Sequence, residues 1–324
     1  MFNRWMIASA ATVMLALPLQ AWPQAGYPSR TVRILVGFPP GQATDVVARA
    51  IAQKLTETMG QQFIVDNRAG AAGIIGSEQA AKATPDGYTL LMSSSGPLAV
   101  NPGLYSKLPY DPVRDFAPIT VATTVPLFIV ANPGFPPNTV NEFVTFAKAN
   151  QGRISYASGG NGVTNHLAME LFKSTAEINL VHVPYKGGPP ALTDLIAGQV
   201  AVMFETGPGA LPHVRSGKLK GIAVGSLRRS SAAPELPTVA EAGFPGFEAV
   251  AWIALVAPAG TPPPIIARLH AEIVKMLNLP ETKERFIALG AEPVGNKPEE
   301  FAIYLKSEIA KWGKVVRDSG AKVD

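Results

Sequence analysis

Cysteine is absent from the 324-residue chain, and this absence removes several kinds of chemistry. Without cysteine there is no disulfide bond, no thiolate nucleophile and no zinc–cysteine site. A chain of this length buries enough apolar surface to fold without such cross-links. The lack of cysteine therefore excludes these sites but says little about the compartment.

Common motifs for nucleotide binding and catalysis are missing as well. The sequence contains no GxxxxGK[ST] phosphate loop and no GxSxG nucleophile elbow, and the loop from Gly160 to Asn165 lacks the third glycine of GxGxxG. The four histidines form no HxxxH pair that would suit a metal ion. We therefore expect no metal and no cofactor.

Basic residues do not gather in the sequence. The net charge is +4, and the most notable basic run is the dipeptide Arg228-Arg229. Nucleic-acid-binding proteins usually cluster basic residues on one face and interleave them with aromatic ones. We therefore expect no nucleic-acid partner, whereas a mild positive charge is compatible with steering small anions toward the protein.

The first 25 residues have the three-part pattern of a secretory signal peptide. Arg4 supplies a positive charge, residues 5–19 are almost wholly apolar, and small residues follow up to Ala25. The apolar run is shorter than the roughly 20 residues that span a bilayer. We expect cleavage after Ala21 or Ala25 and a mature protein that is exported.

The rest of the chain alternates between strand-like and helix-like segments, which favours two α/β domains. We place their boundary near residues 120–126, with a return crossing near residues 249–256. Strands are expected at residues 31–38, 62–65, 88–92, 127–131, 154–157, 180–183, 200–204, 220–224 and 250–256. Helices are expected at residues 44–59, 71–83, 140–149, 163–173, 189–197, 265–277, 280–289 and 298–318.

The stretch LVGFPPGQATDVVARAIAQKL contains a strand, a Pro-Pro-Gly turn and the start of a helix. The first N–H groups of a helix have no partner within it and carry a partial positive charge, so such a helix start can bind an anion. The alternative is that Thr44 and Asp45 cap this helix from within, with Asp45 also pairing with Arg49.

A second stretch, ISYASGGNGVTNHLAMELF, repeats this arrangement about 120 residues later, in the other expected domain. Its glycines allow positive φ angles and a close approach of the backbone to a ligand. Ser158, Asn161 and Thr164 add uncharged donors. If the two domains face each other, two helix N-termini converge on one cleft, which suits a carboxylate.

Candidate catalytic residues are few. Ser158 and His166 are a conceivable nucleophile and base, although no elbow motif supports them. Glu205 follows an apolar strand and precedes Gly207-Pro208-Gly209, so it is expected either at the ligand cleft, accepting a hydrogen bond, or in a solvated loop. Residues 93–95 are three serines that place hydroxyl groups at the end of another strand.

Several long stretches resemble one family. The chain resembles the Bug-type extracytoplasmic solute receptors of tripartite tricarboxylate transporters from the mature start to the end. The stretches that carry the resemblance are YPSRTVRILVGFPPGQATDVVAR, VDNRAGAAGIIGSEQAAKATPDGYTLLMSSSG, YASGGNGVTNHLAMELF, VPYKGGPPALTDLIAGQV and AWIALVAPAGTP.

The resemblance implies a type 2 periplasmic binding protein, an α/β fold of two domains that close on a ligand like a Venus flytrap. Domain 1 is then expected to comprise residues 26–123 and 252–324, and domain 2 residues 124–251. The resemblance implies that a carboxylate is held by backbone groups of two loops and by bridging waters, and the loops correspond here to Phe38–Asp45 and Ser158–Thr164. The family usually has a second glycine where this chain has Gln42, whose side chain is expected to enter or narrow the cleft.

The expected ligand site combines both loops with positions at other strand ends. These residues are Phe38, Gln42, Ala43, Thr44, Asp45, Ser94, Ser158, Gly159, Asn161, Gly162, Thr164, Tyr185, Phe204 and Glu205.

The resemblance and the two loops together predict a periplasmic, monomeric protein that is not an enzyme. It would capture a small organic carboxylate and deliver it to integral membrane transporter subunits. Two alternatives stay open from the sequence. One is a secreted hydrolase that uses Ser158 and His166, and the other is a receptor that signals to a membrane sensor.

Overall fold

The computed structural model describes residues 26–288 and 290–321. The expected signal peptide, residues 1–25, lies outside the described residues. Within them, no helix is both long enough and apolar enough to span a bilayer.

The first lobe is built around three parallel strands, with β1 between β2 and β3. β1 has the sequence Val-Arg-Ile-Leu-Val, and its four apolar residues are fully buried, as expected for a parallel strand covered on both faces. The elements of this part are β1 (Val32–Val36), α1 (Ala43–Met59), β2 (Phe63–Asn67), η1 (Ala71–Gly73), α2 (Ile74–Ala81), β3 (Thr89–Ser94), η2 (Gly96–Val100) and α3 (Asn101–Leu104).

The second lobe repeats the alternation of strand and helix. Its strand β5 pairs in parallel with both β6 and β7. Its elements are α4 (Val140–Ala149), β5 (Ser155–Ser158), α5 (Thr164–Ala176), β6 (Val181–Pro184), α6 (Gly188–Ile196), β7 (Val202–Thr206), α7 (Gly207–Arg215) and β8 (Lys220–Val224).

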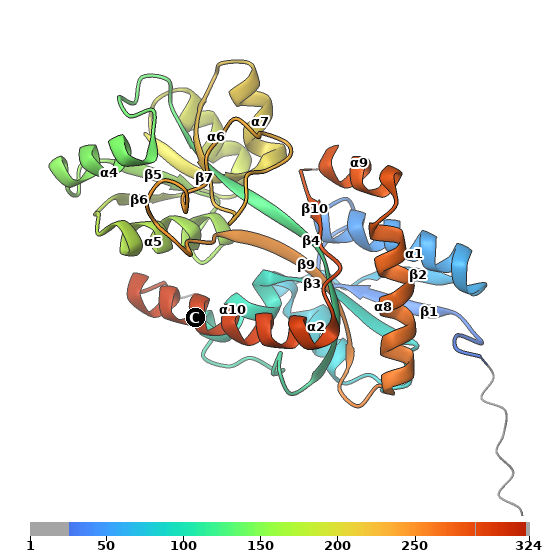
Figure 1. Ribbon diagram of the computed structural model, residues 1–324. Helices are drawn as coiled ribbons and strands as arrows, with labels where there is room; N and C mark the ends of the chain where they lie inside the picture. Colours follow the sequence, from blue (N-terminus) through green and yellow to red (C-terminus); the bar gives the residue numbers. More distant parts are fainter. Residues whose placement is uncertain (1–25, 289, 322–324) are drawn as a thin grey trace, which may run out of the picture.

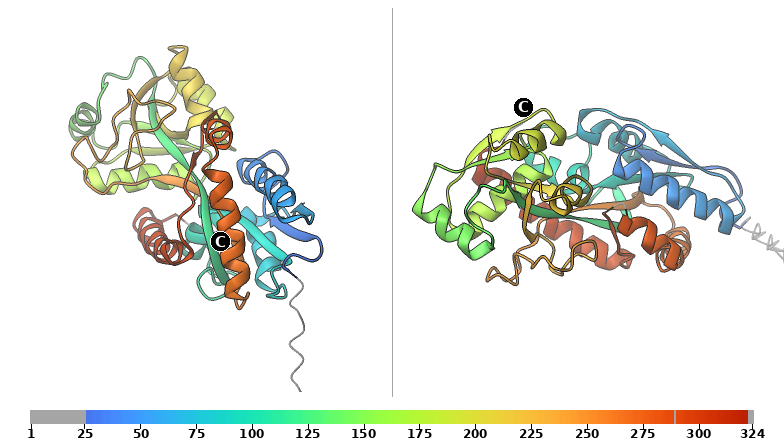
Figure 2. Two further views of the ribbon diagram at one scale, coloured as in Figure 1. Left: turned by 45° about the vertical axis from the view of Figure 1, so that its right-hand side comes forward. Right: turned by 90° about the horizontal axis from the view of Figure 1, so that it is seen from above.

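Two antiparallel strands join the lobes, β4 (Phe116–Ala131) and β9 (Val250–Pro258) (Figure 1). β9 pairs with β3 in the first lobe, and the last third of β4 pairs with β7 in the second. A continuous sheet results, with the order β2-β1-β3-β9-β4-β7-β5-β6, while β8 and the short β10 (Glu292–Pro293) also pair with β4. Figure 2 shows the lobes at opposite ends of this connection.

Helices cover both faces of the sheet in each lobe. In the first, α1 and α8 (Pro263–Leu277) pack on one face, and α2, η2 and α10 (Pro298–Ser319) pack on the other, while α9 (Pro280–Ala288) follows α8. In the second lobe, α4 and α5 lie on one face and α6 and α7 on the other. Apolar residues therefore pack on both faces of the sheet in each lobe, and the cluster around α10 also includes Leu167 of α5 in the second lobe.

Most of the expected elements are confirmed to within a few residues, but η2 with α3, α7, the first part of β4 and the short β10 were not predicted. η2 with α3 begins Gly-Pro, and α7 begins Gly-Pro-Gly, so their composition favoured turns. The unpredicted part of β4, residues 116–126, contains Pro118 and Pro126, and proline disfavours a strand. The pairing of β4 with β9 accommodates this part through register shifts between Pro118 and Thr120 and between Val121 and Thr123.

A buried carboxylate fastens α10 to the crossing strand β9. Glu308 of α10 is 2% exposed, and its Oε2 accepts hydrogen bonds from two indole N–H groups, Trp252 of β9 and Trp312 of α10, each at 2.9 Å. Lys311 pairs with the same carboxylate. Every strong polar group in this cluster is therefore satisfied, as buried polar groups require.

We expect Glu308→Ala to lower the free energy of unfolding by about 3 kcal/mol, because it leaves two buried indole N–H groups without their acceptor and removes the ion pair with Lys311. Urea denaturation measures the effect. The control is Glu299→Ala in the exposed first turn of the same helix, for which a loss below about 1 kcal/mol is expected. Equal losses in the two variants would contradict a special role for the Glu308 cluster.

Candidate functional site

In both lobes, the expected site residues lie at the carboxyl ends of parallel strands. β1 leads into Phe38 and β3 ends at Ser94, whereas β5 ends at Ser158 and β7 ends one residue after Glu205. Ligands of open α/β sheets bind at this edge, because loops and helix N-termini gather there. The architecture thus places candidate ligand-binding groups in each lobe.

The loops that lead into α1 and α5 have the same backbone conformation. Gly41 and Gly162 have φ angles of 85° and 74°. The next residues, Gln42 and Val163, have φ/ψ of −74°/160° and −73°/160°. Positive φ is easily adopted by glycine alone, so the two glycines give both loops their shape.

A side chain four residues after each glycine fixes the same turn. The N–H of Gly41 donates to Asp45 Oδ2 at 2.8 Å, and the N–H of Gly162 donates to His166 Nδ1 at 3.0 Å. An aspartate and a histidine thus perform one structural task in two lobes that share no obvious sequence motif.

The first turns of α1 and α5 present backbone N–H groups that have no intrahelical acceptor. Neither N-cap side chain makes a capping hydrogen bond. Together with the helix dipole, these N–H groups form an anion-binding arrangement at the start of each helix. The residues that carry them are Ala43, Thr44 and Asp45 in α1 and Thr164, Asn165 and His166 in α5.

The Asp45 carboxylate is turned inward. It is 1% exposed and accepts hydrogen bonds from Arg49 and Asn67, each at 2.9 Å, in addition to the one from Gly41. Burial disfavours its charge, but these hydrogen bonds outweigh burial and hold the pKa of Asp45 below its ordinary value. The expected pair of Asp45 with Arg49 is present, but the Asp45 carboxylate binds the Gly41 N–H, which precedes α1, and not an N–H of the first helical turn. The backbone N–H groups of that turn therefore stay available beside it.

The other expected residues of the first lobe differ in exposure. Gln42 and Ala43 are exposed, Phe38 and Ser94 are half-buried, and Thr44 is buried. The Phe38 carbonyl accepts a hydrogen bond from Asn67 Nδ2 at 2.9 Å. Asn67, which ends β2 at the same sheet edge, was not among the predicted site residues; its position at the end of the strand was the available signal.

In the second lobe, hydrogen bonds link the loops after β5 and β6. Tyr185 N–H donates to the Ser158 carbonyl at 2.9 Å, and Gly187 N–H donates to the Gly159 carbonyl at 3.0 Å. Gly162 is buried, while Asn161 is exposed and Thr164 is half-exposed. The structure therefore assembles the expected loop residues of this lobe at one edge.

Ser158 and His166 do not form the arrangement of a nucleophile and its base. Ser158 is fully buried, and its Oγ lies 2.6 Å from His182 Nε2 and 3.1 Å from the Gly160 carbonyl. The Nδ1 of His166 is occupied by the N–H of Gly162, and its Nε2 faces Glu170 at 4.0 Å. This geometry gives the Ser158 hydroxyl a role in shaping the loop.

Two stacked histidines contact the loop after β5. The rings of His166 and His182 are 4.0 Å apart and nearly parallel, and Tyr156 stacks on His182 at 4.8 Å. Burial and the neighbouring His182 lower the pKa of His166 to about 4, and burial also lowers the pKa of His182. His182 was not among the predicted site residues; its place in a short strand was the available signal.

Glu205 is 7% exposed and only partly satisfied. Its Oε1 accepts hydrogen bonds from the N–H and the hydroxyl of Thr206, at 2.7 and 2.8 Å. Its Oε2 is buried and has no hydrogen-bond partner among the described residues. Burial raises the pKa of Glu205, although the hydrogen bonds from Thr206 act in the opposite direction.

Two further expected residues have other surroundings. The Tyr185 hydroxyl donates to Asp194 at 2.7 Å, and burial with this hydrogen bond raises the pKa of Tyr185 to about 12. Phe204 is fully buried in the core of the second lobe, beside Phe172 and Phe247. The Phe204 side chain therefore supports β7 from inside the lobe.

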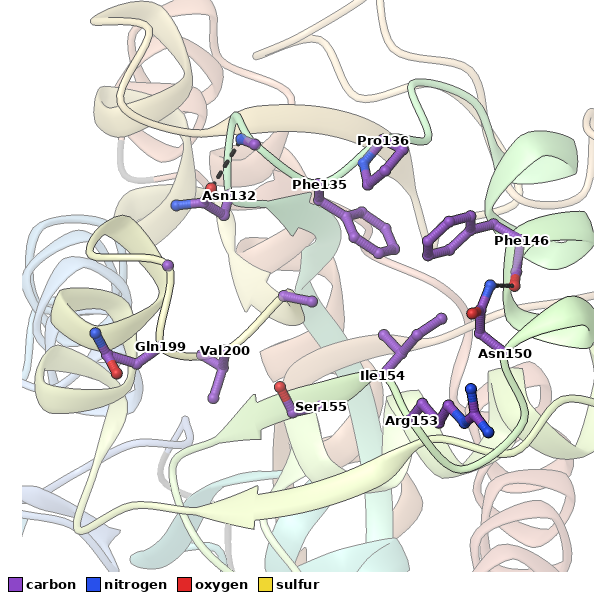
Figure 3. Close-up of a pocket in the computed structure, with 13 residues that line it drawn as sticks. Asn132, Phe135, Pro136, Phe146, Asn150, Arg153, Ile154, Ser155, Gln199 and Val200 are labelled. Atoms are coloured by element: carbon purple, nitrogen blue, oxygen red, sulfur yellow. Dashed lines mark hydrogen bonds between the residues drawn. The ribbon is translucent and has the colours of Figure 1, made fainter.

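A cavity of about 400 Å³ lies at the opposite end of the second lobe (Figure 3). Phe135 and Phe146 form an edge-to-face pair beside it, and Arg153 and Ser155 line it near the start of β5. Since the expected loop begins at Ser158, at the other end of the same strand, this cavity is separate from the candidate site.

Comparison with known proteins identifies the family. The model of the tripartite tricarboxylate transporter family receptor matches residues 47–321. BugT of Bordetella pertussis is 42% identical over 97% of this chain and 95% of its own length. The chain belongs to this receptor family.

Solved structures are similar to this receptor over nearly all of its length. Rpa4515 of R. palustris with adipate is 35% identical, with 92% of this chain and 100% of that chain covered and a TM-score of 0.76. MatC of Rhodopseudomonas palustris with bound malate is 34% identical, with 90% and 100% covered and a TM-score of 0.71. The expected two-domain solute-binding fold is thereby confirmed.

The buried histidines of the receptor make its stability depend on pH. A histidine has a pKa of about 6.5 in the unfolded chain, so the unfolded state binds more protons than the folded state as the pH falls from 6.5 toward 4. The contribution of neutral His166 is complete above pH 6.5 and is lost over this range, with a slope of up to about 1.4 kcal/mol per pH unit.

We expect His166→Asn, which keeps an acceptor for the Gly162 N–H but cannot take up the proton, to reduce this slope. Denaturant unfolding between pH 7 and 4 measures it. The control is His213→Asn in the last turn of α7, which should keep the slope of the unchanged receptor. An unchanged slope in His166→Asn would show that His166 is not the group responsible.

Proposed function

We propose that this receptor captures a small organic carboxylate between its two lobes and delivers it to the membrane subunits of a tripartite tricarboxylate-type transporter. The main support is the pair of matching helix starts, one in each lobe, whose N–H groups lack capping side chains. Two such ends suit an anionic group better than a neutral one. The adipate and malate bound by related proteins agree with this ligand class.

In this proposal, the carboxylate is held mainly by backbone N–H groups of the first turns of α1 and α5. Gln42, Asn161 and Thr164 lie at these turns with exposed or half-exposed side chains and supply further polar contacts. Phe38, Ser94 and Tyr185 line the site, and Asp45, Ser158, Gly159 and Gly162 shape its loops. Because the Phe204 side chain is enclosed in the core, it is left out of the contact set.

The two lobes act as the moving parts. Residues 26–123 with 252–324 form one domain and residues 124–251 form the other, so β4 and β9 connect them near the ends of these ranges. Domain closure around a ligand is the usual behaviour of such two-lobed proteins. The ligand then contacts both helix starts only in the closed form.

We further propose that the mature receptor is a periplasmic monomer without catalytic activity or cofactor. Its export depends on the signal peptide expected at residues 1–25. The hydrolase alternative loses support because Ser158 is buried and contacts His182 and not His166.

Titration of the purified receptor with carboxylates, each beside its neutral amide, tests the proposed ligand class. A ligand at a hundred times its dissociation constant is expected to raise the free energy of unfolding by about 2.7 kcal/mol, which a thermal shift detects. One acid should stabilise the receptor while its amide does not. Equal stabilisation by acid and amide, or a flat panel after unfolding and refolding, would contradict carboxylate binding.

Gly162→Val is expected to weaken binding of such an acid at least about tenfold, or 1.4 kcal/mol. A β-branched residue at a φ of 74° strains the loop and displaces the Gly162 N–H from His166. Isothermal titration calorimetry gives the affinity. Gly217→Val is the matched control, because Gly217 also has positive φ, 70°, but follows α7. Equal affinities in both variants would remove this loop from the site.

Delivery to a transporter is tested in cells. Deletion of the gene should abolish uptake of the radiolabelled acid, and the unchanged receptor supplied in trans should restore it. Normal uptake with loss of a transcriptional response to the acid would instead assign the receptor to a membrane sensor.

A further inference from the structure

The unpartnered oxygen of Glu205 lies where three helices of the second lobe begin. A Cβ added to Gly188, the first residue of α6, would lie 3.2 Å from Glu205 Oε2. A Cβ added to Gly209, in the first turn of α7, would lie 2.9 Å from Glu205 Cγ. Two glycines therefore provide the space for this carboxylate, and both are half-exposed.

The three helix starts around Glu205 differ in how many N–H groups they offer. Proline has no N–H, so α6 loses two donors to Pro189 and Pro190, and α7 loses one to Pro208. α5 has no proline in its first turn and keeps its donors. A ligand anion in this lobe is therefore best held by the first turn of α5.

Gly159 connects the α5 turn to the surroundings of Glu205. Its N–H donates to Asn165 Oδ1 in the first turn of α5 at 3.2 Å, and a Cβ added to Gly159 would lie 3.3 Å from the backbone N of Gly188, which is beside Glu205 Oε2. The unpartnered oxygen is therefore close to the turn that would receive the ligand carboxylate. A buried carboxylate oxygen without a donor is costly, so the arrangement favours a ligand that brings a donor.

We propose that Glu205 selects carboxylates that carry a hydroxyl or ammonium group on the carbon next to the carboxylate, with Oε2 accepting that hydrogen bond. This inference rests on the proposed function, because it assigns the ligand carboxylate to the first turn of α5. The Thr206 hydrogen bonds to Oε1 orient the carboxyl group, and the donor of the ligand supplies the missing hydrogen bond to Oε2. Acids without such a donor leave Oε2 unpaired and bind less tightly.

The test compares matched acids by calorimetry. The probes are malate with succinate, aspartate with succinate, lactate with propionate and mandelate with phenylacetate. One of these pairs of acids should fit the site. In that pair, the receptor should bind the acid with the hydroxyl or ammonium group at least about tenfold more tightly than the acid without it, because a hydrogen bond to a charged group is strong.

Glu205→Gln separates a ligand contact from a structural role. With an amide NH₂ in place of Oε2, the variant should lose the tenfold preference while it keeps its affinity for the acid that lacks the donor. Glu170→Gln is the matched control, since Glu170 is a carboxylate of the same lobe that pairs with Lys173 and Tyr156. The control should keep the preference.

The remaining outcomes contradict the proposal in different ways. Equal weakening of both acids by Glu205→Gln would make Glu205 structural only, and an unchanged preference would mean that the carboxyl group does not accept from the ligand. A receptor that binds carboxylates without preferring the donor would overturn the role of Glu205 and leave the proposed function standing. Failure of every acid and amide to bind would instead overturn the proposed function itself.

Discussion

The antiparallel pairing of β4 with β9 is the interaction on which the rest of the structure depends. These strands make one sheet out of two lobes, so the strand ends that carry the candidate site are positioned through them. Glu308 then ties β9 to α10 through Trp252, and α10 also packs against α5 of the other lobe through the cluster that includes Leu167. The position of the α5 turn is thus linked to the first lobe by the core as well as by the sheet.

Within this frame, two loops reach the same shape by different chemistry. Asp45 is a charged acceptor whose burial is offset by Arg49 and Asn67, whereas His166 is a neutral acceptor within a stack of rings. Each side chain satisfies the glycine N–H before its helix and leaves the next N–H groups without a cap. The shared geometry is therefore a property of the turn, and the residue type can follow the surroundings in each lobe.

Most strands, most helices and both glycine loops were predictable from the sequence, because apolar periodicity and glycine position are local signals. The contacts inside the site were not. The glycine and its acceptor are four residues apart in both loops, yet nothing local distinguishes His166 as an acceptor from a packed histidine. The partners Asn67 and His182 come from other strands, and the enclosure of Phe204 depends on Phe172 and Phe247, which are distant in sequence. Residues 116–126 of β4 were not predicted as a strand because they contain two prolines, which the register shifts against β9 accommodate.

Those register shifts have a mechanical consequence. Sliding of one lobe past the other would break the backbone hydrogen bonds along the whole length of β4 and β9. Bending would distort the backbone mainly at places where these hydrogen bonds are already interrupted. Such interruptions occur between Pro118 and Thr120, between Val121 and Thr123, and again between Ile129 and Val130 where β4 pairs with β8. The connection is therefore expected to resist sliding more than bending, and its interruptions occur both where β4 pairs with β9 and where it pairs with β8.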